Sequence, residues 1–220
     1  MRFHTVSRGD TLYSIAWRYG RDFRQLAAIN GIAPPYQIFP GQHLKLVGRA
    51  LATTSLAAPK NTRKTPRRVS HTATKPRPKA VKSLTSSKPR KPASRVSSSG
   101  IRWQWPAHGK VISRFQAKNP LRKGVDIAGQ KGESVLAAAN GTVIYAGSAL
   151  RGYGKLLIVK HNDEYLSAYA HNHKLLVREG SEVKAGQRIA ELGSSGTDRN
   201  KLHFEIRRNG QPVDPLAYLP

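Results

Sequence analysis

A 52-residue stretch of the chain, residues 49–100, cannot form a globular core and therefore divides the sequence into two foldable parts. It contains fourteen Lys and Arg residues, no Asp or Glu and no Phe, Trp or Tyr, and is otherwise mainly Pro, Ser, Thr and Ala. Such a composition buries too little apolar surface to offset the entropy that is lost on ordering. We therefore expect a disordered linker over 49–100, between independently folded domains at 1–48 and 101–220.

The net charge of the chain, +26, is spread unevenly over these three parts. The linker carries +14, whereas residues 1–48 carry +4 and residues 101–220 carry +8. A basic linker can hold weakly to anionic envelope polymers or to a membrane surface, or it can serve only as a soluble spacer, and both interpretations stay open. The chain has no Cys, which excludes disulfides and thiolate metal sites, and no apolar run of the roughly 18 residues that span a bilayer.

The first 48 residues predict a strand, two helices and a second strand. Apolar residues spaced i, i+3, i+4 and i+7 from Leu12 follow one face of a helix that ends at Gly20. A second helix is predicted over 22–30, because an Asp that can cap it stands at its start and an Asn-Gly pair at its end. Short strands at 3–6 and 42–47 flank the helices, so the expected order is βααβ.

This segment resembles a LysM module over nearly its whole length. The resemblance rests on HTVSRGDTLYSIAWRYG, on the Asn-Gly pair that ends the second helix, and on IFPGQHLKL. It implies binding of N-acetylglucosamine-containing glycan, chiefly peptidoglycan, in a shallow groove between the loop after the first strand and the loop before the second. The residues that the resemblance places in this groove are Gly9, Asp10, Thr11, Leu12, Asn30, Gly31, Ile32, Tyr36 and Ile38. The alternative is that these are turn and capping residues alone.

Residues 101–220 predict a mainly antiparallel β domain. Short segments with period-two alternation are separated by Gly and by turn dipeptides such as Asn140-Gly141 and Asn209-Gly210. The predicted strands are 111–115, 124–127, 134–138, 142–146, 156–161, 165–171, 187–192 and 202–207. No capped helix falls between them, which argues against an α/β fold.

Alternation along these strands groups several polar residues. In KLHFEI the apolar residues share one face, so Lys201 and His203 lie on the other. In YLSAYAH the same reasoning groups Tyr169 with His171, and in GVDI it places Asp126 opposite its apolar neighbours. A carboxylate and imidazoles are ligands that zinc accepts, so the pattern by itself suggests a zinc site.

The same domain is similar to the lysostaphin/LytM-type zinc endopeptidases, whose active members cut peptidoglycan cross-bridges. The resemblance rests on GVDIAGQKGESVLAAANGTVIYAG, GYGKLLIVKH, YLSAYAH, VKAGQRIAELGSSG and LHFEIRRNGQPVDPLAYL. Active members carry H-x-G-x-D, which supplies a His and an Asp ligand, and H-x-H, which supplies a catalytic His followed by the third ligand. Here the motifs read RKGVD and KLH, so Arg122 and Lys201 replace two motif histidines. Asp126 and His203 are kept, as is His171 of the Y-x-H segment.

These departures predict a domain that binds no metal and is not an enzyme. Catalytic zinc needs three protein ligands, and the resemblance leaves two. A divalent ion and a unit positive charge about 5 Å apart repel by roughly 6–7 kcal/mol at an effective dielectric of about 20, and both replacements are cationic. We expect Arg122 to pair with Asp126 and no cofactor to bind. The alternative is an active zinc-dependent peptidoglycan endopeptidase with a rearranged ligand set that uses His173 or Asp198.

The LysM module, the basic linker and the LytM-like domain together resemble the NlpD-type cell-division activators, also in IAWRYGRDFRQLA and WQWP. The resemblance implies a non-catalytic protein that binds peptidoglycan and activates a periplasmic N-acetylmuramoyl-L-alanine amidase in septal cell-wall splitting and daughter-cell separation. The vestigial active-site groove would bind the amidase. The residues expected to make that contact are Arg122, Asp126, Tyr169, His171, Arg199, Lys201 and His203.

The resemblance implies a periplasmic protein that is associated with the outer membrane in its full-length form, although this chain shows no signal peptide and no Cys for lipidation. A nucleic-acid-associated basic protein is another class that the charge allows. The linker, however, lacks the aromatic residues that stack on bases, and neither domain carries a nucleic-acid motif, so we expect no specific nucleic acid partner.

Overall fold

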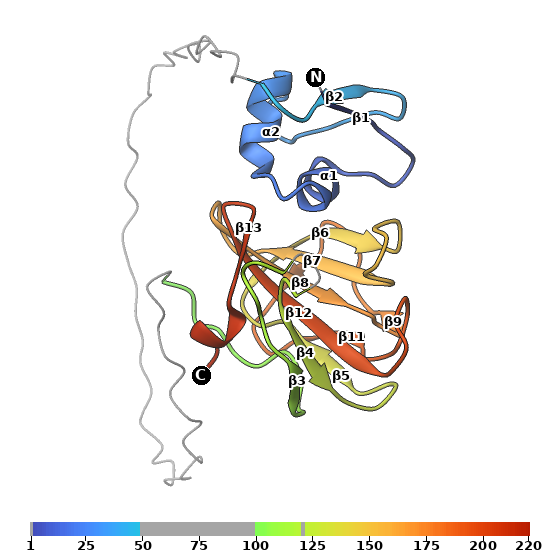
Figure 1. Ribbon diagram of the computed structural model, residues 1–220, viewed down its shortest axis with the longest axis vertical. Coiled ribbons are helices and arrows are strands. Elements are labelled where there is room, and N and C mark those ends of the chain that lie inside the picture. Colours follow the sequence, from blue (N-terminus) through green and yellow to red (C-terminus); the bar gives the residue numbers. More distant parts are fainter. Residues whose placement is uncertain (1, 49–99, 120–121) are drawn as a thin grey trace, which may run out of the picture. The chain divides into compact units, whose positions relative to one another are not determined.

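The computed structural model describes residues 2–48, 100–119 and 122–220. The predicted linker therefore lies, except for Gly100, outside the described residues. Among the helices that are described, none is both long and apolar enough to cross a membrane. Figure 1 labels the two α-helices and most of the strands.

The N-terminal domain has the predicted βααβ order (Figure 1). Strand β1 (Phe3–Thr5) pairs antiparallel with β2 (His43–Lys45), and helices α1 (Leu12–Arg18) and α2 (Phe23–Asn30) lie between them in the chain. Apolar side chains from both helices and from β2, together with residues next to the two strands, form one core. Its buried members are Val6, Leu12, Ile15, Ala16, Phe23, Leu26, Ala27, Leu44 and Leu46.

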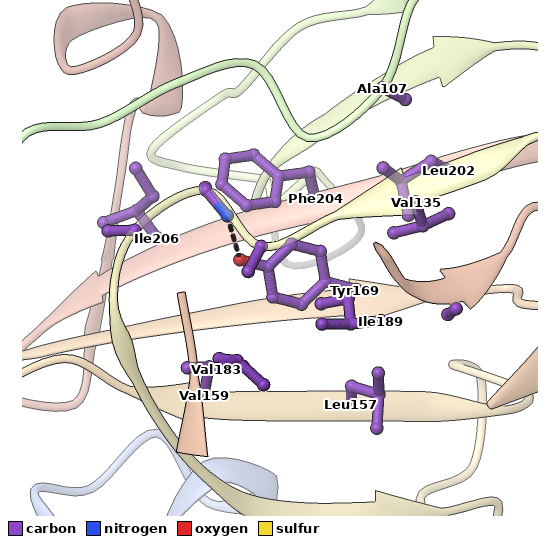
Figure 2. Close-up of a cluster of buried hydrophobic side chains, with 14 of the residues drawn as sticks. Ala107, Val135, Leu157, Val159, Tyr169, Val183, Ile189, Leu202, Phe204 and Ile206 are labelled. Atoms are coloured by element: carbon purple, nitrogen blue, oxygen red, sulfur yellow. Dashed lines mark hydrogen bonds between the residues drawn. The ribbon is translucent and has the colours of Figure 1, made fainter. Parts of the chain in front are cut away.

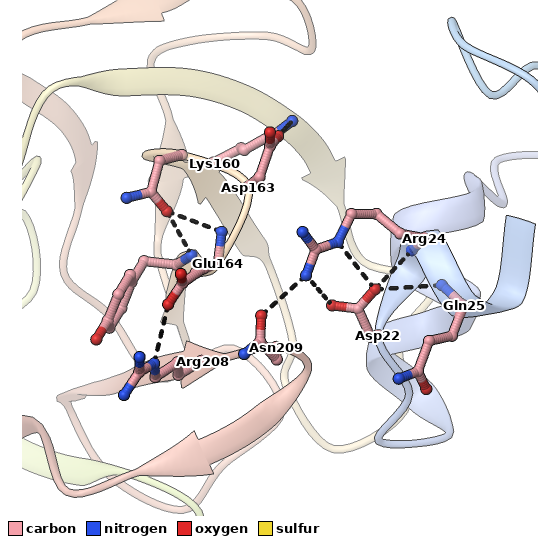
Figure 3. Close-up of polar contacts among 10 residues, drawn as sticks. Asp22, Arg24, Gln25, Lys160, Asp163, Glu164, Arg208 and Asn209 are labelled. Atoms are coloured by element: carbon pink, nitrogen blue, oxygen red, sulfur yellow. Dashed lines mark hydrogen bonds and ion pairs between the residues drawn. The ribbon is translucent and has the colours of Figure 1, made fainter.

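Local side-chain contacts explain where both helices begin and end. Thr11 caps α1 in a capping box with Ser14, in which each side chain bonds the other residue's backbone N–H. Asp22 caps α2 by accepting the backbone N–H of Gln25 (Figure 3). Helix α2 ends at Gly31, whose φ of 66° lies in the left-handed region that glycine adopts without steric cost. Both ends of α2 and the start of α1 agree with the sequence prediction, whereas α1 ends at Arg18, two residues before the predicted Gly20.

The C-terminal domain is built from antiparallel strands, as predicted. The main sheet has the order β10-β6-β7-β8-β12-β4-β3, with β13 pairing with β12, and a smaller sheet has the order β5-β11-β9. The strands are β3 (Val111–Ser113), β4 (Val125–Ala128), β5 (Ser134–Leu136), β6 (Gly141–Gly147), β7 (Leu156–Lys160), β8 (Tyr165–Ala170), β9 (Lys174–Leu175), β10 (Glu182–Val183), β11 (Arg188–Glu191), β12 (Lys201–Arg208) and β13 (Gln211–Val213). A 3-10 helix (Pro215–Ala217) follows β13. The sequence pattern missed β9 and β10, whose two residues are too few to show an alternation, and β13, whose three residues include Pro212.

The core of this domain lies between the main sheet and the smaller one, and Figure 2 shows part of it. Leu202, Phe204 and Ile206 of β12 all belong to it, which confirms the predicted alternation of that strand. Tyr169 of β8 points into the same core, where its phenol oxygen accepts the backbone N–H of Ala138 at 2.8 Å (Figure 2).

The placement of Tyr169 contradicts the expectation that it lies on an exposed face beside His171. Its side chain is 0 % exposed, and all six residues of β8 are buried. A strand that is buried on both faces shows no reliable polar alternation, so the polarity of YLSAYAH was a poor guide to its orientation. Tyr169 is therefore a core residue with a satisfied hydroxyl, since Ser167 Oγ also lies 2.9 Å from it.

Candidate functional site

The polar residues of the candidate site come together because β4 and β12 are paired in register. Asp126 of β4 lies directly opposite His203 of β12, so their side chains project from the same face. The Asp126 Oδ1 atom is 2.6 Å from Nδ1 of His203, and its Oδ2 atom is 2.9 Å from Nζ of Lys201. Arg122 was expected to pair with Asp126. Lys201 takes that place instead, since the register puts it on the strand next to the carboxylate.

The network continues along β12 as alternating charges. His203 Nε2 is 3.2 Å from Oε1 of Glu205, and the guanidinium of Arg207 reaches the other oxygen of Glu205 at 2.9 Å. The hydroxyl of Tyr153 donates to Glu205 Oε1 at 2.8 Å. Every second residue of β12 from Lys201 to Arg207 thus takes part in one ion-paired row. Each carboxylate in the row contacts two cations, so neither is left as an unpaired charge.

The row fixes the protonation states of its members. Burial by itself would lower the pKa of His203, but the hydrogen bonds from its two N–H groups to Asp126 and Glu205 raise that pKa to about 9. Burial would raise the pKa of Asp126, but bonds from His203 and Lys201 bring it to about 2. The pKa of Glu205 is likewise lowered to about 2, against its burial, chiefly by Arg207 and His203. At neutral pH His203 is therefore an imidazolium between two carboxylates.

His171 lies beside this row but is held differently. It follows the last residue of β8 with a φ of 65°, which turns its ring out of the strand's alternation. Its Nδ1–H donates to the carbonyl of Ser195 at 2.9 Å, and its backbone N–H donates to the carbonyl of Tyr153 at 2.9 Å. Burial, above all, lowers the pKa of His171, so the ring is neutral and its Nε2 can accept a hydrogen bond. His173, two residues on, is exposed rather than aligned with His171 on one strand face.

A cavity of about 360 Å³ opens over these residues. Five of the predicted partner-binding residues line it, namely Arg122, Asp126, His171, Lys201 and His203. Two do not line it. Tyr169 is in the core, and Arg199 is an exposed residue whose guanidinium pairs with its neighbour Asp198 at 2.9 Å.

The cavity also contains residues that the sequence reasoning missed. Lys123 and Arg151 line it, together with Tyr153 and Glu205. Lys123 stands next to Arg122 inside the RKGVD motif, so the motif itself was a signal that could have found it. Arg151 and Tyr153 belong to the loop between β6 and β7, and only the fold brings that loop to the cavity.

The donor set of this cavity does not fit zinc. A ligating imidazole must be neutral with a free ring nitrogen, whereas His203 is protonated and both its nitrogens face carboxylates. Both oxygens of Asp126 are engaged as well, one of them by the Lys201 ammonium. Within the part of the chain that the structure describes, no three His, Asp or Glu residues are arranged to hold a metal ion.

The predicted glycan-binding residues of the N-terminal domain mostly have structural roles. Asp10 accepts from His4 Nε2 at 2.9 Å, Leu12 is a core residue, and Asn30 holds β2 by bonding both the N–H and the carbonyl of Lys45. Tyr36 packs against the rings of Tyr13 and Phe23. Thr11 caps α1, Ile32 and Ile38 pack on the core, and Gly9 and Gly31 are exposed turn residues. Glycan binding by these loops stays a prediction.

The pKa shifts of two histidines predict a stability maximum near pH 6.5. The pKa of His203 is raised, so its contribution to stability is complete below about 6.5 and is lost as the pH rises through about 9. Burial lowers the pKa of His161 to about 4, so the unfolded chain takes up its proton first and stability falls as the pH drops from about 6.5 to 4. On each side of pH 6.5, the free energy of unfolding should decrease by roughly 3 kcal/mol, at about 1.4 kcal/mol per pKa unit.

Urea unfolding at a series of pH values measures both decreases in the free energy of unfolding. In the His203→Gln variant the decrease above pH 6.5 should largely disappear, while the decrease toward pH 4, to which His161 and His171 both contribute, should remain. If the stability of His203→Gln fell as steeply above pH 6.5 as that of the wild-type protein, His203 would not be the imidazolium that is lost at alkaline pH.

Comparison with known proteins defines the class of this chain in two parts. Residues 4–47 match the LysM domain, and residues 120–215 match Peptidase family M23. Among solved structures, the chain is similar to a zinc-containing peptidase from Vibrio cholerae, with 31% identity over 54% of this chain and 40% of that one and a TM-score of 0.48. The family matches alone carry the classification. The chain thus combines a LysM module with a domain of the M23 type.

Relatives that match over 99% of this chain place it in a particular family. It is 54% identical to the lipoprotein NlpD/LppB homolog of Pseudomonas aeruginosa, over 99% of this chain and 76% of that protein. It is 42% identical to the murein hydrolase activator NlpD of Escherichia coli, over 99% of this chain and 67% of that protein. The chain belongs to the NlpD family.

Proposed function

We propose that this protein is a non-catalytic activator of a periplasmic N-acetylmuramoyl-L-alanine amidase, acting in the splitting of septal cell wall. The observation that carries the proposal is the ion-paired row, in which the carboxylates of Asp126 and Glu205 are neutralised by Lys201, His203 and Arg207. An M23-type domain whose metal ligands are neutralised by its own cations keeps a groove but has no place for a catalytic ion. Relatives named murein hydrolase activators support the same role.

The loss of the family's motif histidines is part of this proposal. Arg122 stands at the position of the first motif histidine and lines the cavity, and Lys201 stands at the position of the catalytic histidine. Lys201 does more than remove a catalytic group, because its ammonium occupies the oxygen of Asp126 that a metal would need. The substitution thus stabilises the inactive arrangement.

The LysM module would localise the activator by binding peptidoglycan glycan strands. The proposed location is the periplasm, with the full-length protein held at the outer membrane. Relatives named as lipoproteins support this location. Contact of the basic linker with anionic envelope polymers remains part of the proposal, as does the absence of a specific nucleic acid partner.

The test of this function is dye release from labelled sacculi by purified protein, with and without a purified periplasmic amidase of the same organism. Each reaction is run with this protein either treated with chelator or supplied with zinc. We expect release only when the amidase is present, to the same extent after chelator treatment of this protein. Zinc-dependent release by this protein alone would mean that it is a peptidase, and no stimulation of any periplasmic amidase would contradict the activator role.

A further inference from the structure

The side chains that line the cavity carry an excess of positive charge, even after the ion pairs among them are subtracted. Five cationic side chains line it, namely Arg122, Lys123, Arg151, Lys201 and His203, against the two carboxylates Asp126 and Glu205. Lys201 and His203 are already used by those carboxylates. Over residues 100–119 and 122–220, no carboxylate forms an ion pair with any of the other three cations.

One close backbone contact and one side-chain hydrogen bond explain why these three cations lie around the same cavity. Gly124 lies so close to β12 that a Cβ atom there would collide with the carbonyl of Phe204. This close approach carries the preceding Arg122 and Lys123 to the cavity. Arg151 reaches it from the β6–β7 loop, whose Tyr153 is anchored to Glu205. The three cations thus come from two separate segments that are held against the same ion-paired row.

The neutral His171 adds a different group to the cavity. Its Nδ1–H is donated to Ser195, so its Nε2 atom is an acceptor beside the cations. A carboxylate satisfies arginine and lysine through charge-assisted hydrogen bonds, and a neighbouring N–H of the same ligand can satisfy the imidazole. A peptide segment that carries Asp or Glu side chains offers both groups. A cavity of about 360 Å³ holds one or two side chains rather than a folded element.

We propose that the segment of the amidase that enters this cavity is acidic, and that Arg122, Lys123 and Arg151 bind its carboxylates. This inference rests on the proposed function and specifies the chemistry of the contact. It also revises which cations recognise the partner. Lys201 and Arg199, expected from the sequence to serve in that role, are instead paired with Asp126 and Asp198.

The test is the affinity of the full chain for the purified amidase, measured by calorimetric titration at about 50 and 300 mM salt. The double variant Arg122→Glu/Arg151→Glu should bind at least about tenfold more weakly at low salt, because like charges then face the segment. Wild-type affinity should fall with salt, whereas the residual affinity of the double variant should change little. Stimulation of sacculus dye release should fall in parallel.

The matched control is Arg199→Glu, which changes an exposed cation outside the cavity and should leave the amidase affinity within about twofold of wild type. Unfolding in urea checks that the variants are folded, and Lys123→Glu serves as a single substitution if the double variant is not. Wild-type affinity in the double variant, with amidase stimulation intact, would overturn the acidic-segment inference and leave the activator role standing. A wild-type protein that fails to stimulate the amidase would instead overturn the activator role.

One further outcome separates the amidase segment from the cell wall itself. The peptides of peptidoglycan also carry carboxylates, so the double variant is tested for binding to sacculi without amidase. Loss of sacculus binding with unchanged amidase affinity would assign the three cations to wall peptides and overturn the proposal. Unchanged sacculus binding with weakened amidase affinity supports it.

Discussion

Replacing Glu205 by Gln should lower the free energy of unfolding by about 3–5 kcal/mol, the usual cost of removing one partner from a buried ion pair. Glu205 is 0 % exposed and accepts from His203, Arg207 and Tyr153 at once. The amide has nearly the same shape but no charge, so it leaves two buried cations without their shared carboxylate. Urea unfolding at pH 7 measures the loss.

The matched control for this prediction is Asp198→Asn. Asp198 forms an exposed pair with Arg199, which is expected to contribute less than about 1 kcal/mol. If Glu205→Gln cost no more than Asp198→Asn, the row along β12 would contribute little to stability. The arrangement would then have to be explained by its effect on the cavity alone.

Restoring the two motif histidines should create a zinc site. The double variant Arg122→His/Lys201→His removes both cations, and it frees one oxygen of Asp126 that the Lys201 ammonium now holds. With both unit charges gone, His203 can lose its proton in favour of a metal bond. Because each nearby charge repels a divalent ion by several kcal/mol, we expect the affinity for zinc to rise at least about a hundredfold. Competition with a chelating dye measures it.

The control variant here is Arg122→Gln/Lys201→Gln, which removes the same charges but adds no ligand. It should bind zinc more weakly than the histidine variant, because charge removal alone supplies only Asp126 and His203. Tight binding of one zinc ion by the wild-type protein would show that the ion-paired row opens readily. That result would revive the endopeptidase alternative, in which another ligand set holds the metal.

In the proposed function, the two positions that the resemblance assigns to motif histidines, Arg122 and Lys201, have different roles. Lys201 forms an ion pair with Asp126, whereas Arg122 has no ion pair over residues 100–119 and 122–220 and lines the cavity. The same kind of replacement, a cation where the resemblance expects His, is thus proposed to serve a structural role at Lys201 and a recognition role at Arg122. Sequence comparison alone gives the two substitutions the same meaning.

Much of the fold was predictable because its signals are local. The caps at Thr11 and Asp22 and the glycine after α2 act over three or four residues, and the alternation of β12 repeats every two. Such patterns predict the βααβ module, the antiparallel domain and the shared face of Lys201 and His203 on β12. They failed for Tyr169, because β8 is buried on both faces and polarity then carries no information about direction.

The sequence by itself determined the kinds of element, their order and the identity of the residues at the positions that the resemblance assigns to metal motifs. Only the tertiary structure decided which charges neutralise one another, since the choice of Lys201 over Arg122 as partner of Asp126 depends on strand register and on distance through space. The same holds for the protonation of His203, which depends on two carboxylates 77 and two residues away in the chain. The strength of an electrostatic interaction depends on the distance between the charges in space and on their burial. The spacing of residues along the sequence gives neither quantity.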